Sequence, residues 1–176
     1  METRNLADLY DLPTLDWAPI AARLERGYPQ APGTGGPDRH STWLATINPD
    51  GSPHVTGIGA EWVDGTFWFV TAETSRKGRN LARDPRCTLS VATHEFDLVL
   101  DGDAHKVTDP ATVAAMADHF NDDGWPCRVD ESGEAITAPF SAPSAGPPPW
   151  HVYRVTARAA TALQVVEPNG ATHWRF

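Results

Sequence analysis

The sequence has few cysteines, no motif of a thiol or metal site around them, and no long apolar run. Cys87 and Cys127 form no CxxC pair, and a disulfide between them is unsupported, so we expect reduced thiols. No uninterrupted apolar stretch approaches the roughly 20 residues of a membrane-spanning helix. The first 13 residues contain acids and lack the apolar segment of a secretory signal. We therefore expect a cytoplasmic protein without a membrane segment.

Basic residues are also scarce, with 14 Lys and Arg against 23 Asp and Glu and a net charge of −9. This balance argues against a nucleic-acid-binding protein or a basic membrane-surface protein. The seven histidines form no HxH or HExxH motif. His94 and Glu95 are adjacent on an expected strand and would point to opposite faces, so we expect no metal site. No GxSxG motif marks a nucleophile, and we assign no catalytic side chain.

The 176 residues, 40% of them hydrophobic, suffice for one domain with a buried core. We divide the chain into an extension, residues 1–40, and a main domain, residues 41–176. In the extension, the first dozen residues are expected to be a mobile lead-in. Leu15–Arg26 has helical apolar spacing with Asp16 as its cap, and Ala31–His40 has the composition of a loop. The glycines at 33, 35 and 36 lack the lysine of a phosphate-binding loop.

From Ser41 onward the pattern is that of an antiparallel β protein. Pro49–Ser52 is a strong turn signal, and Asp64–Gly65 is a hairpin signal because both residues tolerate positive φ. Helices are expected after Ser75 and after Asp109, each of which can cap one. Strands are expected at residues 41–48, 53–63, 66–71, 87–93, 96–108 and 150–163. This order predicts a mainly β fold of about six strands, a small closed or partly open antiparallel barrel with short helices.

Positive charge is concentrated in one place. Five of the 14 basic residues fall within eleven positions of the helix that follows Ser75 and its exit: Arg76, Lys77, Arg79, Arg83 and Arg86. Arg76 and Lys77 lie in the first turn, where the helix N-terminus already carries a partial positive charge. An anion would remove this conflict, so the pattern predicts a phosphate site. The alternative interpretation is a group of solvated surface cations.

The order of strand, PDG turn, strand, DG hairpin, strand, T-x(3)-S-R-K-x-x-N helix, R-D-P-R and strand resembles the split-barrel flavin-binding superfamily. That superfamily contains the pyridoxamine 5'-phosphate oxidases and the related deazaflavin-dependent reductases. The resemblance covers Ser41–Thr108 and extends to the strand from Trp150. It implies a six-stranded antiparallel split β-barrel with short flanking helices, and a homodimer with FMN or coenzyme F-420 bound between two barrels.

The resemblance also implies roles for individual residues. Arg76 and Lys77 would bind the cofactor phosphate, with Ser75 and Asn80 assisting. Val70 and Thr71 would line the path from the ribityl chain to the phosphate. Backbone groups of the second strand would face the edge of the isoalloxazine ring, at Val55, Thr56, Gly57 and Ile58.

That second strand differs from the vitamin B6 oxidases. Those enzymes have a basic, bulky R-x-V-L-x-K strand, whereas this chain has VTGIGA, and it ends in HWRF without their characteristic C-terminal segment. The strand and the overall layout resemble the deazaflavin branch more. Gly57 and Gly59 would leave the backbone open to a flat ring. Alternatively, each glycine forms a β-bulge that curls the barrel.

The functional hypothesis is an oxidoreductase that transfers a hydride between bound flavin or deazaflavin and a small organic substrate. The alternatives are a non-catalytic flavin- or deazaflavin-binding or carrier protein, and a barrel that acts only as a dimeric interaction module. The proline-rich segment PFSAPSAGPPPW is interpreted either as a stiff connector across the barrel or as a polyproline ligand.

Overall fold

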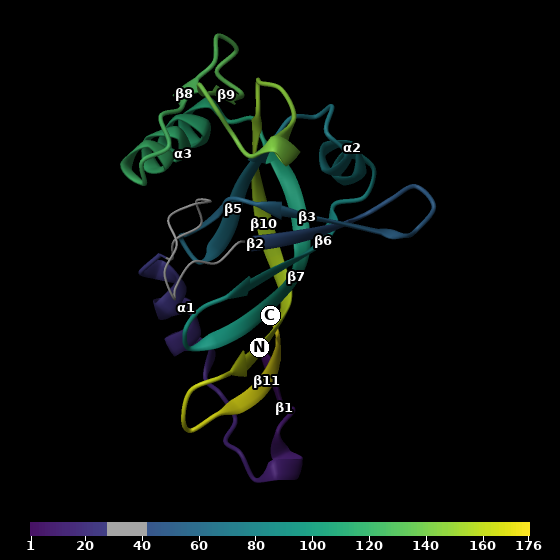
Figure 1. Cartoon of the computed structure of the whole chain (residues 1–176), viewed down its shortest axis with the longest axis vertical. Coiled ribbons are helices and arrows are strands. Elements are labelled where there is room, and N and C mark those ends of the chain that lie inside the picture. Colours follow the sequence, from purple (N-terminus) through teal and green to yellow (C-terminus); the bar gives the residue numbers. More distant parts are fainter. Residues whose placement is uncertain (28–41) are drawn as a thin grey trace.

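The structure is a computed structural model that describes residues 1–27 and 42–176; the expected loop Ala31–His40 lies outside the described residues. Figure 1 shows an elongated, mainly β molecule with helices at its sides. The helices are α1 (Trp17–Glu25), α2 (Arg76–Arg83) and α3 (Pro110–Asp122), with short 3-10 turns η1 (Asp8–Tyr10) and η2 (Pro143–Ala145). The strands are β1 (Glu2–Asn5), β2 (Thr42–Ile47), β3 (Pro53–Ile58), β4 (Ala60–Val63), β5 (Thr66–Thr71), β6 (Arg86–Ala92), β7 (Phe96–Val107), β8 (Arg128–Val129), β9 (Ile136–Thr137), β10 (His151–Gln164) and β11 (Gly170–Arg175).

The predicted split barrel is confirmed. Antiparallel pairing runs from β4 to β5, β10, β7, β6, β2 and β3 in turn. The expected strand at residues 53–63 is divided at Gly59 into β3, which pairs with β2, and β4, which pairs with β5. Because β3 and β4 are joined through the chain rather than by ladder hydrogen bonds, the barrel stays split at this point. Counting β3 and β4 together, the barrel uses the six predicted strands.

The two longest strands extend the sheet beyond the barrel. The first residues of β10 lie between β5 and β7, whereas Ala159–Gln164 pairs with β7 and β11. β11 in turn pairs with β1, in register from Glu2 with Arg175 to Asn5 with Thr172. The expectation of a mobile lead-in is therefore wrong for residues 2–5. Their polar sequence gives no strand signal, and their conformation comes from pairing with a strand at the other end of the chain.

Most local signals produce the expected geometry. Asp64 and Gly65 have φ values of 50° and 73° in the hairpin between β4 and β5. The Asp109 side chain accepts a 2.8 Å hydrogen bond from the Thr112 amide and caps α3. Asp16 precedes α1 with extended backbone, but its side chain makes no capping hydrogen bond. The expectation that Asp16 caps α1 is wrong in this respect.

Two apolar clusters form the core. The larger one fills the barrel and includes Phe67, Phe69 and Tyr153, with Leu24 of α1 closing one side. The second lies between β5, the start of β10 and α3, where Val113, Met116, Ala117 and Phe120 are buried on the predicted face. Both Cys87 and Cys127 are buried free thiols. None of the helices in the described residues is long and apolar enough to cross a membrane.

Candidate functional site

Helix α2 is held tightly at its N-terminus. Ser75 accepts a 3.0 Å hydrogen bond from the Gly78 amide, as predicted, and its hydroxyl lies 2.8 Å from that of Thr71. A Cβ at position 78 would lie 2.3 Å from the Ala72 carbonyl oxygen. Only glycine allows this approach of the helix to the end of β5. The first turn of α2 is thus fixed against the strand that precedes it.

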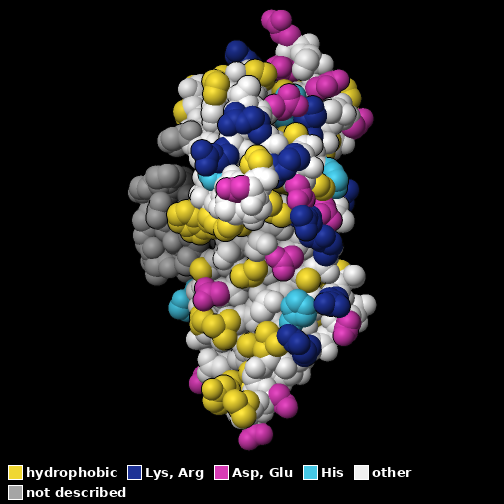
Figure 2. All heavy atoms as spheres, turned by 90° about the vertical axis from the view of Figure 1, so that its right-hand side faces the viewer, with side chains coloured by type: hydrophobic (Ala, Val, Ile, Leu, Met, Phe, Trp, Pro, Cys, Tyr) yellow, Lys and Arg dark blue, Asp and Glu magenta, His cyan; other side chains and the backbone are white. Residues whose placement is uncertain are grey.

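One face of α2 borders a cavity of about 560 Å³. Arg76, Arg79 and Arg83 line it together with Asn80, and the β2–β3 turn contributes Asn48, Pro49 and Asp50. Figure 2 shows the side of the molecule on which α2 lies, with Lys and Arg side chains gathered in its upper half, at the height of α2. Asp50, the one acidic group among these lining residues, accepts two hydrogen bonds from Ser52, of 2.9 and 2.6 Å. The lining therefore carries a net positive charge suited to an anion.

Lys77 does not line this cavity. Successive helical residues are about 100° apart, so the side chains of Arg76 and Lys77 diverge. Lys77 is 1% exposed, and its Nζ donates to the carbonyl oxygen of Ser144. Burial lowers the pKa of Lys77 to about 8. An ammonium group here lacks water and gains little from a neutral carbonyl, so an added negative charge would stabilise it.

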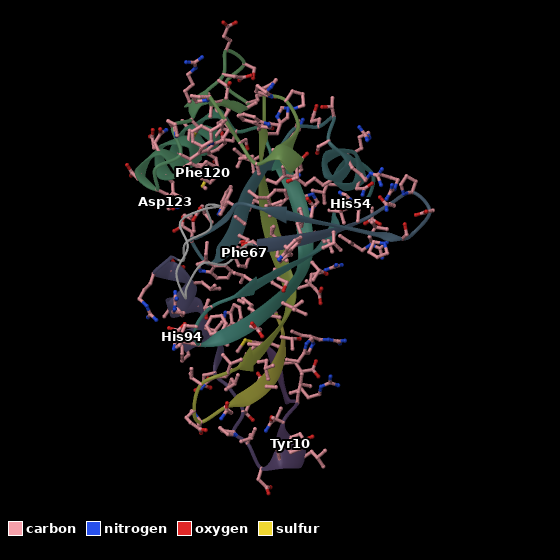
Figure 3. All side chains as sticks on the ribbon, in the orientation of Figure 1. Tyr10, His54, Phe67, His94, Phe120 and Asp123 are labelled. Carbon is pink, nitrogen blue, oxygen red and sulfur yellow. The ribbon has the colours of Figure 1, made fainter. Side chains whose placement is uncertain are left out.

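His54 on β3 lies beside these cations, and Figure 3 shows it next to α2. Burial lowers the pKa of His54, and the positive charges of Arg76 and Lys77 lower it further. The shift indicates a positive electrostatic potential that reaches from α2 to β3. The two cations thus act on one region although their side chains leave the helix in different directions.

Asn80 joins α2 to the barrel. Its Nδ2 donates to Thr46 Oγ1 near the end of β2 at 3.1 Å and to Asn48 Oδ1 in the β2–β3 turn at 3.2 Å. The side chain is buried yet belongs to the cavity lining. Its hydrogen bonds hold the cationic face of α2 against the β2–β3 turn.

The proline-rich segment crosses the barrel near Lys77. Ser144 Oγ donates to the Gly57 carbonyl at 2.9 Å, and the Ala145 carbonyl accepts from the Ala72 amide at 2.9 Å. Residues 142–146, hereafter the strap, therefore contact β3, the end of β5 and α2 of their own chain. This placement agrees with the interpretation as a connector.

The strand assigned to the ring edge lies at one end of the sheet. β3 pairs with β2 and is the last strand in the order, so its other edge is outside the ladder. Val55 is 55% exposed, Thr56 and Gly57 are half-buried, and Ile58 is in the core. A Cβ at Gly57 would lie 3.8 Å from the Trp43 ring, and one at Gly59 would meet nothing within 4 Å. Val70 is half-buried on β5, opposite Val152.

The structure thus gathers Gly57, Thr71, Ser75 and Lys77 around the strap, and places Arg76 and Asn80 at the cavity. Arg79 and Arg83 belong to the charge cluster of the sequence, but the resemblance assigned neither of them to the site. Helical spacing from Arg76 could have identified them, since residues three and seven positions on share its face. Ser144 had no such signal, because its contacts are with residues far away in the chain.

The sequence model of the pyridoxamine 5'-phosphate oxidase family matches residues 37–163, which is more than half of the chain. A pyridoxine/pyridoxamine 5'-phosphate oxidase from Bacteroides thetaiotaomicron is 37% identical over 68 residues, which are 37% of this chain and 32% of that protein. The match thus spans about a third of that relative's length.

Solved structures share the fold. A pyridoxamine 5'-phosphate oxidase-related, FMN-binding protein from Nostoc punctiforme has a TM-score of 0.54 at 16% identity, over 77% of this chain and 80% of the other. General Stress Protein 26 from Bacillus anthracis has a TM-score of 0.56 at 12% identity, over 92% of this chain and 100% of the other. At these identities the likeness concerns the fold alone.

Proposed function

This chain belongs to the pyridoxamine 5'-phosphate oxidase family, and we propose that it is an oxidoreductase that binds a flavin-type cofactor by its phosphate group at α2. The substrate would be a small organic molecule that exchanges a hydride with the cofactor. The cofactor is FMN or coenzyme F-420, of which the VTGIGA strand favours the deazaflavin. The observation that carries the proposal is the cation-lined cavity at α2, with the buried Lys77 behind it.

The residues present fit a phosphate monoester or diester. Arg76, Arg79 and Arg83 offer planar donors on one helix face, the geometry that suits phosphate oxygens. The capped N-terminus of α2 adds its partial positive charge. Lys77 supplies a fourth cation, which an anion between α2 and the strap would neutralise.

Bound cofactor would supply the hydride chemistry, and the protein would anchor it, orient it and exclude water. The edge of β3 that faces away from β2 offers backbone groups toward which a flat ring could be oriented, and at Gly57 the carbonyl already accepts a hydrogen bond from Ser144 of the strap. The strap includes η2, and its residue Ser144 contacts both Lys77 and Gly57. It would cover the site at this point. No side chain needs to act as acid or base in this proposal.

A second copy of the chain would complete the site. Trp43, Val55 and Val99 are apolar side chains on the outer faces of β2, β3 and β7, and they are 52%, 55% and 38% exposed. The register places Trp43 and Val99 in one row across the sheet, separated by Ser90, with Val55 two residues from the position that pairs with Trp43. Exposed apolar side chains on one face of a sheet favour association. We propose a homodimer through this face, working in the cytoplasm, where the two free thiols would stay reduced.

The test is a visible spectrum of the purified protein, followed by titration of cofactor-free protein with FMN and with coenzyme F-420. Arg76→Ala combined with Lys77→Ala should weaken binding at least tenfold, since each charged hydrogen bond contributes about 1.5–3 kcal/mol. Arg128→Ala is the matched control, because Arg128 is exposed on β8. Equal affinity in the double variant and the control would refute the phosphate site. Binding without turnover of any hydride donor or acceptor would favour the carrier alternative.

A further inference from the structure

A group of metal-ligating side chains lies on the opposite side of the barrel from α2. Glu61 comes from β4, and His119 and Asp123 come from the last turn of α3 and its C-cap. In Figure 1, α3 and α2 lie on opposite sides of the sheet, and Figure 3 marks Asp123 beside α3. The group is therefore separate from the proposed cofactor site.

The three side chains converge. One ligand atom from each, a histidine nitrogen or a carboxylate oxygen, lies within 4.8 Å of the other two. His119 and Asp123 are four residues apart, which places them on one face of the helix, and His119 Nε2 is 3.7 Å from Asp123 Oδ2. Ligand atoms around a tetrahedral ion are about 3.4 Å apart when each lies about 2.0–2.1 Å from it. Small side-chain rotations would bring the three donors to that separation, because His119 and Asp123 are partly exposed.

The donor set has the chemistry of a divalent transition-metal site. Imidazole nitrogen and carboxylate oxygen are both ligands that Zn²⁺ takes in proteins, and a neutral histidine selects against Mg²⁺ and Ca²⁺, which prefer oxygen ligands. Glu61 and Asp123 are hydrogen-bonded to each other and so share a proton; when an ion displaces that proton, the two carboxylates neutralise the charge of one divalent ion. The C-terminus of α3, 13 residues long, adds a partial negative charge at the same place.

The site would join α3 and β4, which already meet through apolar packing and through a hydrogen bond between the Glu61 and Asp123 side chains. α3 packs through Val113, Met116 and Phe120 on the second core cluster, to which β4 contributes Val63 at its edge. Glu61 lies two residues before Val63 on the same strand. We propose that Glu61, His119 and Asp123 together bind one Zn²⁺-class ion that fastens α3 to β4 and leaves a coordination position open to water.

The test is titration of the metal-free full-length protein with Zn²⁺ by calorimetry, and with Co²⁺ by visible absorption. We expect one equivalent to bind and the melting temperature to rise with Zn²⁺. His119→Ala should reduce the affinity by about tenfold or more, since even the outer partners of metal ligands contribute about 10–100-fold. Asp123→Asn should do the same.

Two control variants match the perturbation in kind. His105→Ala removes an exposed histidine on β7, and Asp122→Asn changes the exposed carboxylate next to Asp123. Both should bind one equivalent with unchanged affinity. Far-ultraviolet circular dichroism without metal verifies that each variant is folded. The proposal is overturned if no stoichiometric binding occurs, or if His119→Ala and His105→Ala bind Zn²⁺ equally. Neither result depends on whether the protein binds a flavin.

Discussion

Replacing Lys77 by methionine gives the most direct test of the anion site. Methionine is flexible and apolar and can occupy the buried stem of the lysine without the charge. Lys77 is 1% exposed, and its ammonium donates to the carbonyl of Ser144. Loss of one charged hydrogen bond to phosphate costs about 1.5–3 kcal/mol. At about 1.4 kcal/mol for each factor of ten, the cofactor dissociation constant should rise about 10- to 150-fold.

The same substitution should leave the free energy of unfolding at pH 7 unchanged or increased, because it removes a buried charge. The chain has one other lysine, Lys106, whose Nζ lies 2.6 Å from Glu73 Oε1 near the surface. Lys106→Met is therefore the control, with little expected effect on cofactor binding. Fluorescence titration gives the affinities, and urea denaturation gives the stabilities.

The pH dependence provides a second readout for this prediction. The pKa of Lys77 is lowered by burial from 10.5 to about 8. Between these two values the unfolded chain binds more protons than the folded one, so the free energy of unfolding should rise with pH from about 8 to about 10.5. Lys77→Met should lack this contribution. Cofactor affinity of the unmodified protein should fall above pH 8, as the ammonium loses its charge. A Lys77→Met protein with unaltered affinity and unaltered pH profiles would refute the reasoning.

Three further substitutions test other parts of the structure. Gly78→Ala should lower the free energy of unfolding by about 1–3 kcal/mol through its clash with the Ala72 carbonyl, whereas Gly59→Ala, with open space around it, should change urea denaturation little. Ser75→Ala should cost about 1 kcal/mol by removing the cap of α2, and a stability equal to that of the unmodified protein would contradict the capping role. Trp43→Glu should convert the proposed dimer to a monomer in analytical ultracentrifugation, and an unchanged mass would exclude this face as the interface.

The best-predicted features depend on neighbours in the chain. The Asp64–Gly65 hairpin needs two residues that tolerate positive φ, and both have it. The caps of α2 and α3 depend on Ser75 and Asp109 and on amides three residues later. The barrel followed from these turns together with alternating strands. Such signals are visible because sequence neighbours are also spatial neighbours.

The site was predicted only in part. The charge cluster identified α2, and Arg76 and Asn80 do line its cavity. The sequence also assigned Lys77 to the same phosphate, but it could not show that this side chain would be buried beneath the strap. That outcome depends on Ser144, which is 67 residues away in the chain.

The sequence by itself determined the turns, the caps of α2 and α3, the location of the positive charge and a small antiparallel barrel, which the family resemblance specified as a split barrel. Tertiary structure alone decided the pairing of β1 with β11, the break between β3 and β4, the burial of Lys77, and the meeting of Glu61 with His119 and Asp123. The physical reason is the separation in sequence of the residues that interact. A turn or a cap is stabilised within a few residues, whereas these contacts exist only after distant segments have packed together. The local pattern marked Gly59 as a candidate β-bulge but gave no sign of the other contacts.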